Sequence, residues 1–215
     1  MSNISETNIY LENIYDSIKS ELQKLELELK SQLYSVTKSK IDLFNVINYF
    51  FEIPGKKLRP ILTILSAGTV APQHPIKKNV IELAAALELI HNSSLIHDDI
   101  VDESQNRRGR LTMNHRFNNK IAVLAGDLLY THAFLIVNKI DNPQVSGIIA
   151  ECVERMCKSE IKEIISPVSN YDEYISYLDN KTANLMSICC RCGAILSEAD
   201  QETANALGDF GRNFG

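Results

Sequence analysis

The sequence predicts an all-α fold, and three observations indicate this class. Apolar residues recur at three- and four-residue spacing over long segments, which is the period of an amphipathic helix. Helix-disrupting residues are few, with 9 Gly and 6 Pro among 215 residues. No segment shows the alternation of apolar and polar residues that is typical of a half-buried strand. We therefore expect residues 1–215 to form a single all-helical domain.

The predicted helices are long, and short breaks separate them. The first is amphipathic, since apolar side chains recur at helical spacing among Glu and Lys. These apolar residues are Ile14, Ile18, Leu22, Leu25 and Leu29. The full set of helices is expected over residues 8–33, 41–51, 61–70, 77–103, 118–140, 144–165, 171–198 and 201–215.

Residues that break or cap helices mark the boundaries. Proline disrupts a helix interior, whereas asparagine, serine and aspartate favour the N-cap. These signals are Pro54, Gly55 and Pro60 before the third helix, Asn142 and Pro143 before the sixth, and Ser169 and Asp200 at the last two. In the last helix, Gly208, Gly211 and Gly215 lie on one face and permit close helix contact. The sequence stops there without a cap, so we expect a bundle that is incomplete at the C-terminus.

The composition argues against several classes of function. The net charge is −5 and the pI is about 5.6, so there is no broad basic surface and nucleic acid is not an expected partner. We expect no apolar run to be long enough to span a membrane, and the polar start MSNISETNIY is unlike a secretory signal. We therefore expect no transmembrane segment and a cytoplasmic location.

The five cysteines lie on segments that are predicted to be helical. An odd number of thiols favours reduced side chains over a disulfide framework. The run CCRC has C-x-x-C spacing, but no second Cys or His pair at zinc-site spacing accompanies it. Buried helical thiols are therefore favoured over a metal or redox role for Cys152, Cys157, Cys189, Cys190 and Cys192.

Acidic residues gather at the C-terminal end of the fourth predicted helix, in the run LIHDDIVDE. Asp98 and Asp102 are four residues apart, so they project from one face and repel each other. Acids at this end also oppose the helix dipole. Aspartate oxygens one turn apart can bind Mg²⁺, which prefers oxygen ligands and is commonly shared with substrate phosphates. The alternative is a solvated acidic helix end.

Two arginines follow the acids in a loop that Gly109 closes. Arg107 and Arg108 are adjacent, so in an extended loop they can point to opposite sides and contact different phosphate groups. Arginine suits phosphate because its planar guanidinium donates two parallel hydrogen bonds. The alternative is a surface pair that neutralises Asp102 and Glu103, an arrangement that contributes only about 0–1 kcal/mol.

Four motifs, in this order, resemble the trans-isoprenyl diphosphate synthases, and most of all the medium- to long-chain polyprenyl diphosphate synthases. They are GKKLRP (55–60), ELIHNSSLIHDDIVDESQNRRG (88–109), AVLAGDLLYTHAF (122–134) and KTANLMSICCRCGAIL (181–196). The segment GDFGRNFG (208–215) is similar to the one that leads into the family's second aspartate-rich motif. The resemblance covers residue 40 to the end, and it implies an isoprenoid synthase type helical bundle around a central cavity.

The resemblance implies a Mg²⁺-dependent condensation of an allylic diphosphate with isopentenyl diphosphate. It gives catalytic roles to Asp98 and Asp102 as metal ligands, with Asp99 assisting. The other catalytic residues it implies are Arg107, which would contact the allylic diphosphate, and Lys181, which with Thr182 matches the K-T pair beside that substrate. The residues that match the isopentenyl diphosphate site are Lys56, Arg59, His91 and Arg108.

His91 is also placed by its spacing. It lies seven residues before Asp98, two helical turns back on the same face, and so is expected to line the same cavity. The alternative is a histidine satisfied within an apolar core. His97 is assigned no role.

Two serines one turn before the aspartates bear on product length. Ser94 shares a helix face with Asp98, and Ser93 is its neighbour. In the family an aromatic side chain in this region closes the product tunnel, so the two small residues imply a product longer than C15. By this interpretation, Ser93→Tyr shortens the product.

The resemblance also implies features of the full-length protein. Members of the family carry a second aspartate-rich motif, which would lie beyond residue 215, and the full-length form is expected to be a homodimer. The apolar product would allow peripheral membrane contact.

Two other functions remain open from the sequence. One alternative is a non-catalytic partner subunit of a prenyl diphosphate synthase, against which the intact aspartates and arginines argue. The other is a helical metal-binding interaction protein, but the regular EF-hand pattern is absent.

Overall fold

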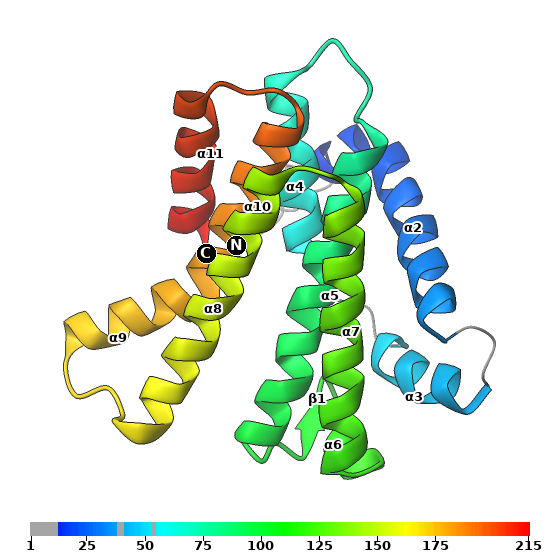
Figure 1. The fold of residues 1–215 in the computed structure, drawn as a ribbon, viewed down its shortest axis with the longest axis vertical. Helices are drawn as coiled ribbons and strands as arrows, with labels where there is room; N and C mark the ends of the chain where they lie inside the picture. Colours follow the sequence, from blue (N-terminus) through cyan, green and yellow to red (C-terminus); the bar gives the residue numbers. More distant parts are fainter. Residues whose placement is uncertain (1–12, 38–40, 53–54) are drawn as a thin grey trace, which may run out of the picture.

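The computed structural model describes residues 13–37, 41–52 and 55–215, and these residues form a helical bundle with one short hairpin (Figure 1). The helices are α2 (Lys19–Thr37), α3 (Ile41–Phe51), α4 (Leu58–Val70), α5 (Lys78–Val101), α6 (Met113–Arg116), α7 (Asn119–Lys139), α8 (Pro143–Ile165), α9 (Tyr171–Leu178), α10 (Asn184–Leu196) and α11 (Gln201–Phe214). The all-α prediction is confirmed. The expected helix start at 8–12 and Pro54 lie outside the described residues. Residues 13–17 are helical, but a turn at Ile18 separates them from α2, so the predicted helix over 8–33 is interrupted, and α2 continues past its predicted end at residue 33.

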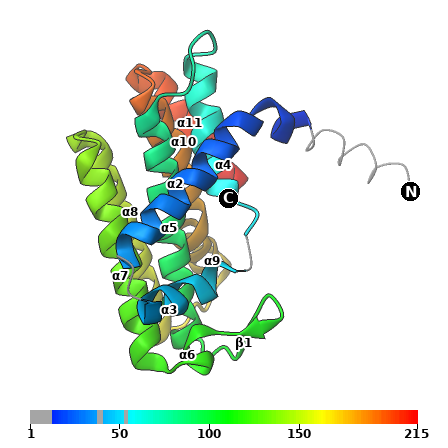
Figure 2. The same cartoon turned by 90° about the vertical axis from the view of Figure 1, so that its right-hand side faces the viewer.

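Helix α5 lies at the centre of the bundle because residues 80–90 are apolar apart from Glu82 and Glu88. These residues are buried apart from the half-buried Glu82, as expected for a largely apolar helix in a protein core. Figure 1 shows α7 beside α5, and Figure 2 shows α2 crossing in front of α5. Each large side chain buried here, such as Leu87 or Ile90, contributes about 1.5–3 kcal/mol. This packing holds the acidic end of α5 in a fixed position.

Helix α7 contradicts the expectation that no apolar run reaches transmembrane length. Among the described residues it is long and apolar enough, by length and composition, to cross a membrane. That signal is weak, because the core helix of a soluble protein passes the same test. Small residues on one face of α7 are buried, among them Ala122, Ala125, Gly126 and Ala133, and α7 packs along α5.

The start of α8 is confirmed, and the start of α9 is corrected. Asn142 caps α8, since its side chain accepts a hydrogen bond from the Val145 N–H at 3.1 Å. The prediction that Ser169 caps the helix at 171 is wrong. Asn170 is the N-cap, because its side chain accepts the Glu173 N–H at 3.0 Å. Ser169 instead donates its N–H and its hydroxyl to the Glu173 carboxylate, each at 3.0 Å.

Helix α11 starts and packs as predicted. The Asp200 side chain accepts the Thr203 N–H at 2.7 Å and caps the helix. A Cβ added at Gly211 would lie 2.6 Å from the carbonyl oxygen of Met186 on α10. Only glycine allows the two backbones to approach this closely. The glycine face of α11 is therefore its contact with α10.

The predicted helix over 171–198 is interrupted in its middle. The five residues Asp179–Ala183 form a π-helical turn, η1, between α9 and α10. The guanidinium of Arg212 on α11 donates two hydrogen bonds to the Asp179 carboxylate, at 2.7 and 2.8 Å. Turns of this type are rare and occur frequently at functional sites. Lys181 and Thr182 lie within this turn rather than in a regular helix.

The prediction of buried helical thiols is confirmed for four of the five cysteines. All five thiols are free, and Cys152, Cys189, Cys190 and Cys192 are buried, whereas Cys157 is exposed. Burial raises the pKa of the Cys152 thiol to about 12. Such a thiol is protonated at neutral pH and is not a reactive nucleophile.

Candidate active site

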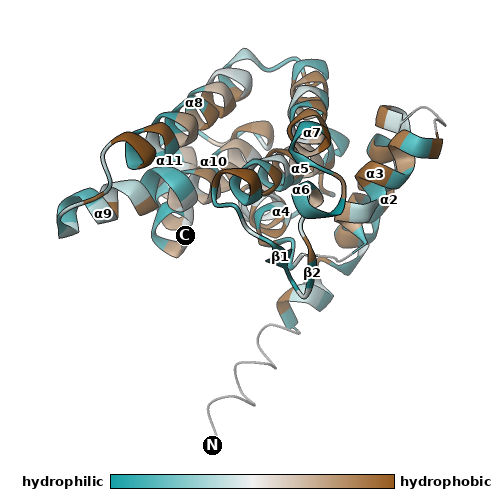
Figure 3. Ribbon diagram, turned by 90° about the horizontal axis from the view of Figure 1, so that it is seen from below, coloured by the Kyte–Doolittle hydropathy of each residue, from teal (hydrophilic) through white to brown (hydrophobic). Residues whose placement is uncertain are grey.

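A β-hairpin follows α5 and carries the two arginines. Strand β1 (Asn106–Arg107) pairs antiparallel with β2 (Arg110–Leu111), although no strand was expected from the sequence. The two turn residues, Arg108 and Gly109, have φ angles of 51° and 80°, and positive φ at both positions is typical of a tight two-residue hairpin. Arg107 is therefore on a strand, and Arg108 is at the turn. The hairpin and α6 lie at the same end of the bundle (Figure 2), and Figure 3 shows that end from below.

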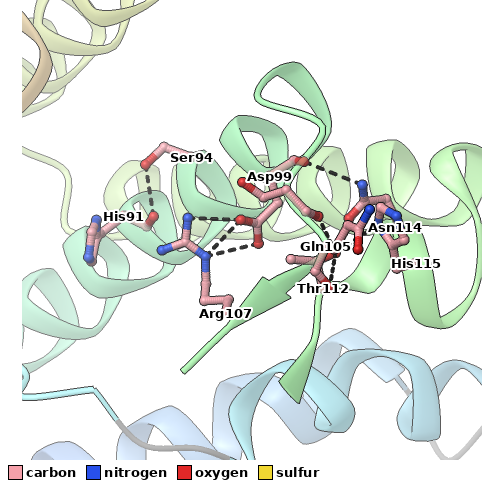
Figure 4. A network of polar contacts seen from close by, with 9 residues as sticks. His91, Ser94, Asp99, Gln105, Arg107, Thr112, Asn114 and His115 are labelled. Carbon is pink, nitrogen blue, oxygen red and sulfur yellow. Dashed lines mark hydrogen bonds and ion pairs between the residues drawn. The ribbon is translucent and has the colours of Figure 1, made fainter. Parts of the chain in front are cut away.

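Arg107 binds Asp99 and attaches the hairpin to α5 (Figure 4). Its Nε lies 2.9 Å from both carboxylate oxygens, and its Nη2 lies 2.9 Å from Oδ1. Asp99 is only 3% exposed. Burial raises the pKa of Asp99, and the charge and hydrogen bond of Arg107 oppose that rise. The Asp99 carboxylate is thus engaged by an arginine in this structure.

We expect Arg107→Ala to destabilise the fold by about 2 kcal/mol, because it leaves a buried carboxylate without its partner. Adding Asp99→Asn should recover most of that loss, since a neutral amide is less costly to bury than a charge. Urea unfolding of the two single variants and the double variant measures the coupling. Arg110→Ala is the control, because Arg110 pairs with the exposed Glu52. Equal destabilisation by Arg107→Ala and Arg110→Ala would contradict this view of the pair.

A cavity of about 420 Å³ brings together the four residues that match the isopentenyl diphosphate site. It is lined from three segments: the turn at 55–57 with the start of α4, one face of α5, and the hairpin turn. A Cβ at Gly55 would lie 3.2 Å from Arg108 Nη2, so the guanidinium of Arg108 packs directly on Gly55. The four residues are Lys56, Arg59, His91 and Arg108.

The lining of this cavity favours an anion. Burial lowers the pKa of His91 to about 3, and the nearby Arg59 and Arg108 lower it further, so the imidazole is neutral at pH 7. Burial also lowers the pKa of Arg59, which still remains charged. The Nε of Arg59 is buried and has no hydrogen-bond acceptor among the described residues.

Glu88 is a further residue of this cavity that was not identified from the sequence. It is 6% exposed, and burial raises its pKa, while Arg59 and a hydrogen bond with Asn92 oppose that rise. It lies on α5 three residues before His91 and therefore on the same helix face. This three-residue spacing from His91 is the sequence signal that could have identified Glu88.

Asp98 and Asp102 stand at the end of α5 as predicted. Asp98 is half-buried, and Asp102 is the exposed C-cap, whose N–H donates to the Asp98 carbonyl at 2.8 Å. Burial raises the pKa of Asp98 to about 6; the charge of Lys181 opposes this rise, and those of Glu160 and Asp102 add to it. A cation bound here would relieve the unfavourable burial of this carboxylate.

The carboxylates at the end of α5 can supply part of a Mg²⁺ coordination shell. Within the described ranges no group of three or more His, Cys, Asp or Glu side chains could hold a metal ion. The chain itself therefore offers the carboxylates of Asp98 and Asp102 rather than a closed cage. Mg²⁺ commonly binds through one or two carboxylates, keeps several waters and shares substrate phosphates. These two residues are compatible with that mode.

Lys181 is held beside the acids by two residues that were not predicted. Its Nζ lies 2.7 Å from Glu160 Oε1 and donates to the Tyr177 hydroxyl at 2.8 Å, while that hydroxyl donates to Glu160 at 3.2 Å. Burial lowers the pKa of Lys181, but Glu160, Tyr177 and Asp98 outweigh burial and raise it overall. Lys181 is therefore charged at neutral pH, and Thr182 beside it is half-buried. Tyr177 lies four residues before Lys181, a local helical spacing that could have identified it, whereas Glu160 comes from α8 and has no local link to Lys181.

The two serines occupy different environments. Ser93 is fully buried, and its hydroxyl donates to the Gly126 carbonyl on α7 at 2.7 Å. Ser94 is half-buried and donates to the His91 carbonyl at 2.8 Å (Figure 4). A bulky side chain at Ser93 would push α7 away from α5. Ser94 is the position at which side-chain size can be changed with less effect on that packing.

An all-α bundle with carboxylates and clustered cations at one end defines the class of this protein: a helical protein with a mixed acidic and basic ligand site. The chain belongs to the polyprenyl synthetase family, whose profile matches residues 41–215. It is similar to a prenyl transferase of Porphyra purpurea, with 34% identity over 206 residues. It is also similar to octaprenyl diphosphate synthase of Escherichia coli, with 30% identity over 209 residues.

A solved structure agrees on the fold. Polyprenyl synthase from Caulobacter crescentus CB15, complexed with calcium and isoprenyl diphosphate, superposes with a TM-score of 0.87 at 24% identity. The match covers 95% of this chain and 61% of that chain. The alignments with the Porphyra and Escherichia proteins cover 94% and 95% of this chain, and 63% and 62% of those proteins. The chain thus spans about three fifths of the length of these relatives.

Proposed function

We propose that this chain acts as a trans-polyprenyl diphosphate synthase, which joins an allylic diphosphate to isopentenyl diphosphate. One observation carries the proposal: Lys56, Arg59, His91 and Arg108 line one cavity of about 420 Å³. The charge of Arg107 acts on both His91 and Asp98, so that cavity and the acidic end of α5 are neighbours. An anion-binding pocket beside a carboxylate site is what a reaction between two diphosphates requires.

The residues take the following roles in the proposal. Lys56, Arg59 and Arg108 bind the diphosphate of isopentenyl diphosphate, and the neutral His91 donates or accepts a hydrogen bond there. Arg107 and Lys181 bind the allylic diphosphate, with Thr182 beside it. Asp98 and Asp102, assisted by Asp99 when Arg107 turns to the substrate, would hold Mg²⁺. Bound Mg²⁺ would neutralise negative charge on the departing diphosphate.

The reaction needs charge stabilisation and a dry site. The C–O bond of the allylic diphosphate breaks, and the diphosphate leaves with the electron pair. The isopentenyl double bond then forms a C–C bond with the allylic cation, and loss of a proton restores a double bond. Arg107 and Lys181 stabilise the charge that develops on the leaving group. The apolar helices below exclude water, which would otherwise capture the cation.

A direct assay tests the proposal. The chain is incubated with Mg²⁺, labelled isopentenyl diphosphate and an allylic diphosphate primer, and we expect a labelled polyprenyl diphosphate whose formation requires Mg²⁺. Binding of isopentenyl diphosphate is measured in parallel by calorimetry. Substrate binding without product, with a changed product length when the chain is added to a complete synthase, would favour the partner-subunit alternative. No binding and no product would reject the proposal.

The pKa of Asp98 predicts a pH dependence for metal binding. Mg²⁺ binds the ionised carboxylate, so protons compete with the metal below the pKa of about 6. We expect the apparent Mg²⁺ affinity to fall up to about tenfold per pH unit below that pKa and to level off above it. Calorimetric titration with Mg²⁺ and diphosphate across this range measures the effect. Asp98→Asn should remove the acid limb, and an unchanged limb in this variant would contradict the assignment.

We also propose that the product is longer than C15 and that Ser94 helps to leave its path open. Ser94→Tyr is expected to shorten the product by one or more isoprene units, because the larger side chain would obstruct growth along α5. Ser94→Ala is the control and should leave product length unchanged. Thin-layer chromatography of the dephosphorylated products measures chain length. Ser93→Tyr is expected to have the same effect but also to lower stability, since Ser93 contacts α7.

The full-length form is proposed to be a cytoplasmic homodimer with no transmembrane segment, which touches membranes only through its apolar product. Apolar side chains on the outer face of α7 support association, because Leu124 is 67% exposed and Leu135 is 53% exposed. A second copy that covers them would remove this surface from water.

A further inference from the structure

A second polar cavity lies away from the residues discussed so far, in the angle between α8 and α9. Its volume is about 270 Å³, and α8, the loop at 166–170, α9 and η1 contribute its walls. In Figure 1 this region is the elbow where α8 and α9 extend from the body of the bundle. The volume is below the range of about 300–1,000 Å³ typical for larger organic ligands. A small ion fits this cavity better than a cofactor does.

Three cations from α8 line this cavity. Arg155, Lys158 and Lys162 are separated by three and four residues, so they lie on one face of the helix. Lys158 is paired with Glu154 at 2.7 Å. Within the part of the chain that the structure describes, no acid lies at ion-pair distance from Arg155 or Lys162. Two cationic groups are therefore available for an incoming ligand.

The two acids in the cavity wall already have partners. Glu163 accepts the Val168 N–H at 3.0 Å. Glu173 accepts the N–H and the hydroxyl of Ser169, each at 3.0 Å, and these bonds lower its pKa. Both carboxylates serve to fix the loop between α8 and α9. Their remaining charge reduces the positive potential of the cavity, and the charge of Lys162 acts on Glu173. Neither acid, however, forms a close ion pair with Arg155 or Lys162.

Tyr177 connects this cavity to the candidate active site. It contributes to the cavity wall, and its hydroxyl accepts from Lys181 and donates to Glu160. A ligand that moves or fixes this ring therefore changes the contacts of Lys181. The hydroxyl has a single proton to donate, so an anion that accepts it would take it from Glu160.

We propose that the α8–α9 cavity binds a small phosphate-class anion and that its occupancy reaches Lys181 through Tyr177. Arg155 and Lys162 supply the charge, and the serine hydroxyls of the wall supply hydrogen-bond donors. Free phosphate and the diphosphate released by prenyl transfer share this chemistry. Binding at the cavity does not depend on the proposed function, whereas the consequence for catalysis rests on the role proposed for Lys181.

Calorimetric titration with inorganic phosphate, and separately with inorganic diphosphate, tests the site. The chain carries Lys56→Ala and Arg108→Ala in every arm, so that binding at the larger cavity is suppressed. Adding Arg155→Gln and Lys162→Gln is expected to weaken binding about tenfold, because two exposed charge contacts are lost. The matched control is Lys19→Gln with Lys120→Gln, which removes the same charge from exposed positions outside the cavity. Equal affinity in the cavity and control variants would overturn the proposal.

Nuclear magnetic resonance of the wild-type chain provides an independent readout if the multiple variants do not fold. Phosphate should shift the backbone signals of Ser176 and Asn180, which line the cavity, and the side-chain signal of Lys181. Tyr177→Phe should keep the first two shifts and lose the third. A Lys181 shift that persists without the hydroxyl would refute the connection, and absent shifts at Ser176 and Asn180 would refute the site. The anion that binds more tightly identifies the source.

Discussion

Asp98→Asn is expected to lower Mg²⁺-dependent prenyl transfer by about a thousandfold, the scale seen when a group that stabilises the transition state through charge is removed. Asparagine has the same shape as aspartate but no negative charge, so the half-buried position should still fold. The pKa of about 6 indicates that the charged carboxylate is disfavoured in the free protein. The variant should therefore be at least as stable as the parent at neutral pH, while its metal affinity falls.

The measurement for Asp98→Asn combines steady-state turnover with thermal unfolding in the absence of metal. Glu103→Gln is the matched control, because it removes one negative charge from the same helix end at an exposed residue outside the proposed metal set. We expect Glu103→Gln to retain most activity. Turnover of Asp98→Asn within about threefold of the parent would rule out a direct role for this carboxylate. If Asp98→Asn lost its folded structure together with its activity, the loss of turnover would no longer support a role for Asp98 in metal binding.

Helical periodicity predicted the elements that position the site because those elements are governed by local patterns. Asp98 and Asp102 share a face of α5 whatever surrounds the helix, and the placement of His91 follows from the same spacing. The contrast at the start of α9 shows the limit of such patterns. Ser169 and Asn170 are both good N-caps, and the choice is made by the Glu173 carboxylate, which binds the N–H and hydroxyl of Ser169.

The rest of the site depends on contacts that sequence spacing does not contain. The hairpin has only two residues in each strand, too few to produce a visible alternation, and its position is set by Arg107 binding Asp99. The π-helical turn at Lys181 is likewise a feature of tertiary structure, with Glu160 on α8 and Arg212 on α11 binding residues in it. For α7, composition alone cannot distinguish a core helix from a membrane span.

Gly193→Ala is expected to destabilise the protein by about 3 kcal/mol, although alanine is the better helix former by about 1 kcal/mol. Gly193 lies on α10 where that helix crosses α4, and a Cβ there would stand 2.4 Å from the carbonyl oxygen of Thr63. A backbone atom in a buried helix cannot rotate away, as the end of a flexible side chain can. Relief therefore requires α4 and α10 to move apart.

Gly147→Ala on α8 is the control, because it lies in a helix and a Cβ there meets nothing within 4 Å. We expect Gly147→Ala to be neutral or to stabilise by up to about 1 kcal/mol. Thermal unfolding should show Gly193→Ala melting about 6–12 °C below the parent, given about 2–4 °C per kcal/mol for a chain of this size. Equal midpoints for the two variants would show that the approach of α4 and α10 is not tight. Because Arg59 is in the first turn of α4 and Lys181 lies in η1, which directly precedes α10, separating these helices should weaken binding of both proposed diphosphate substrates and lower stability.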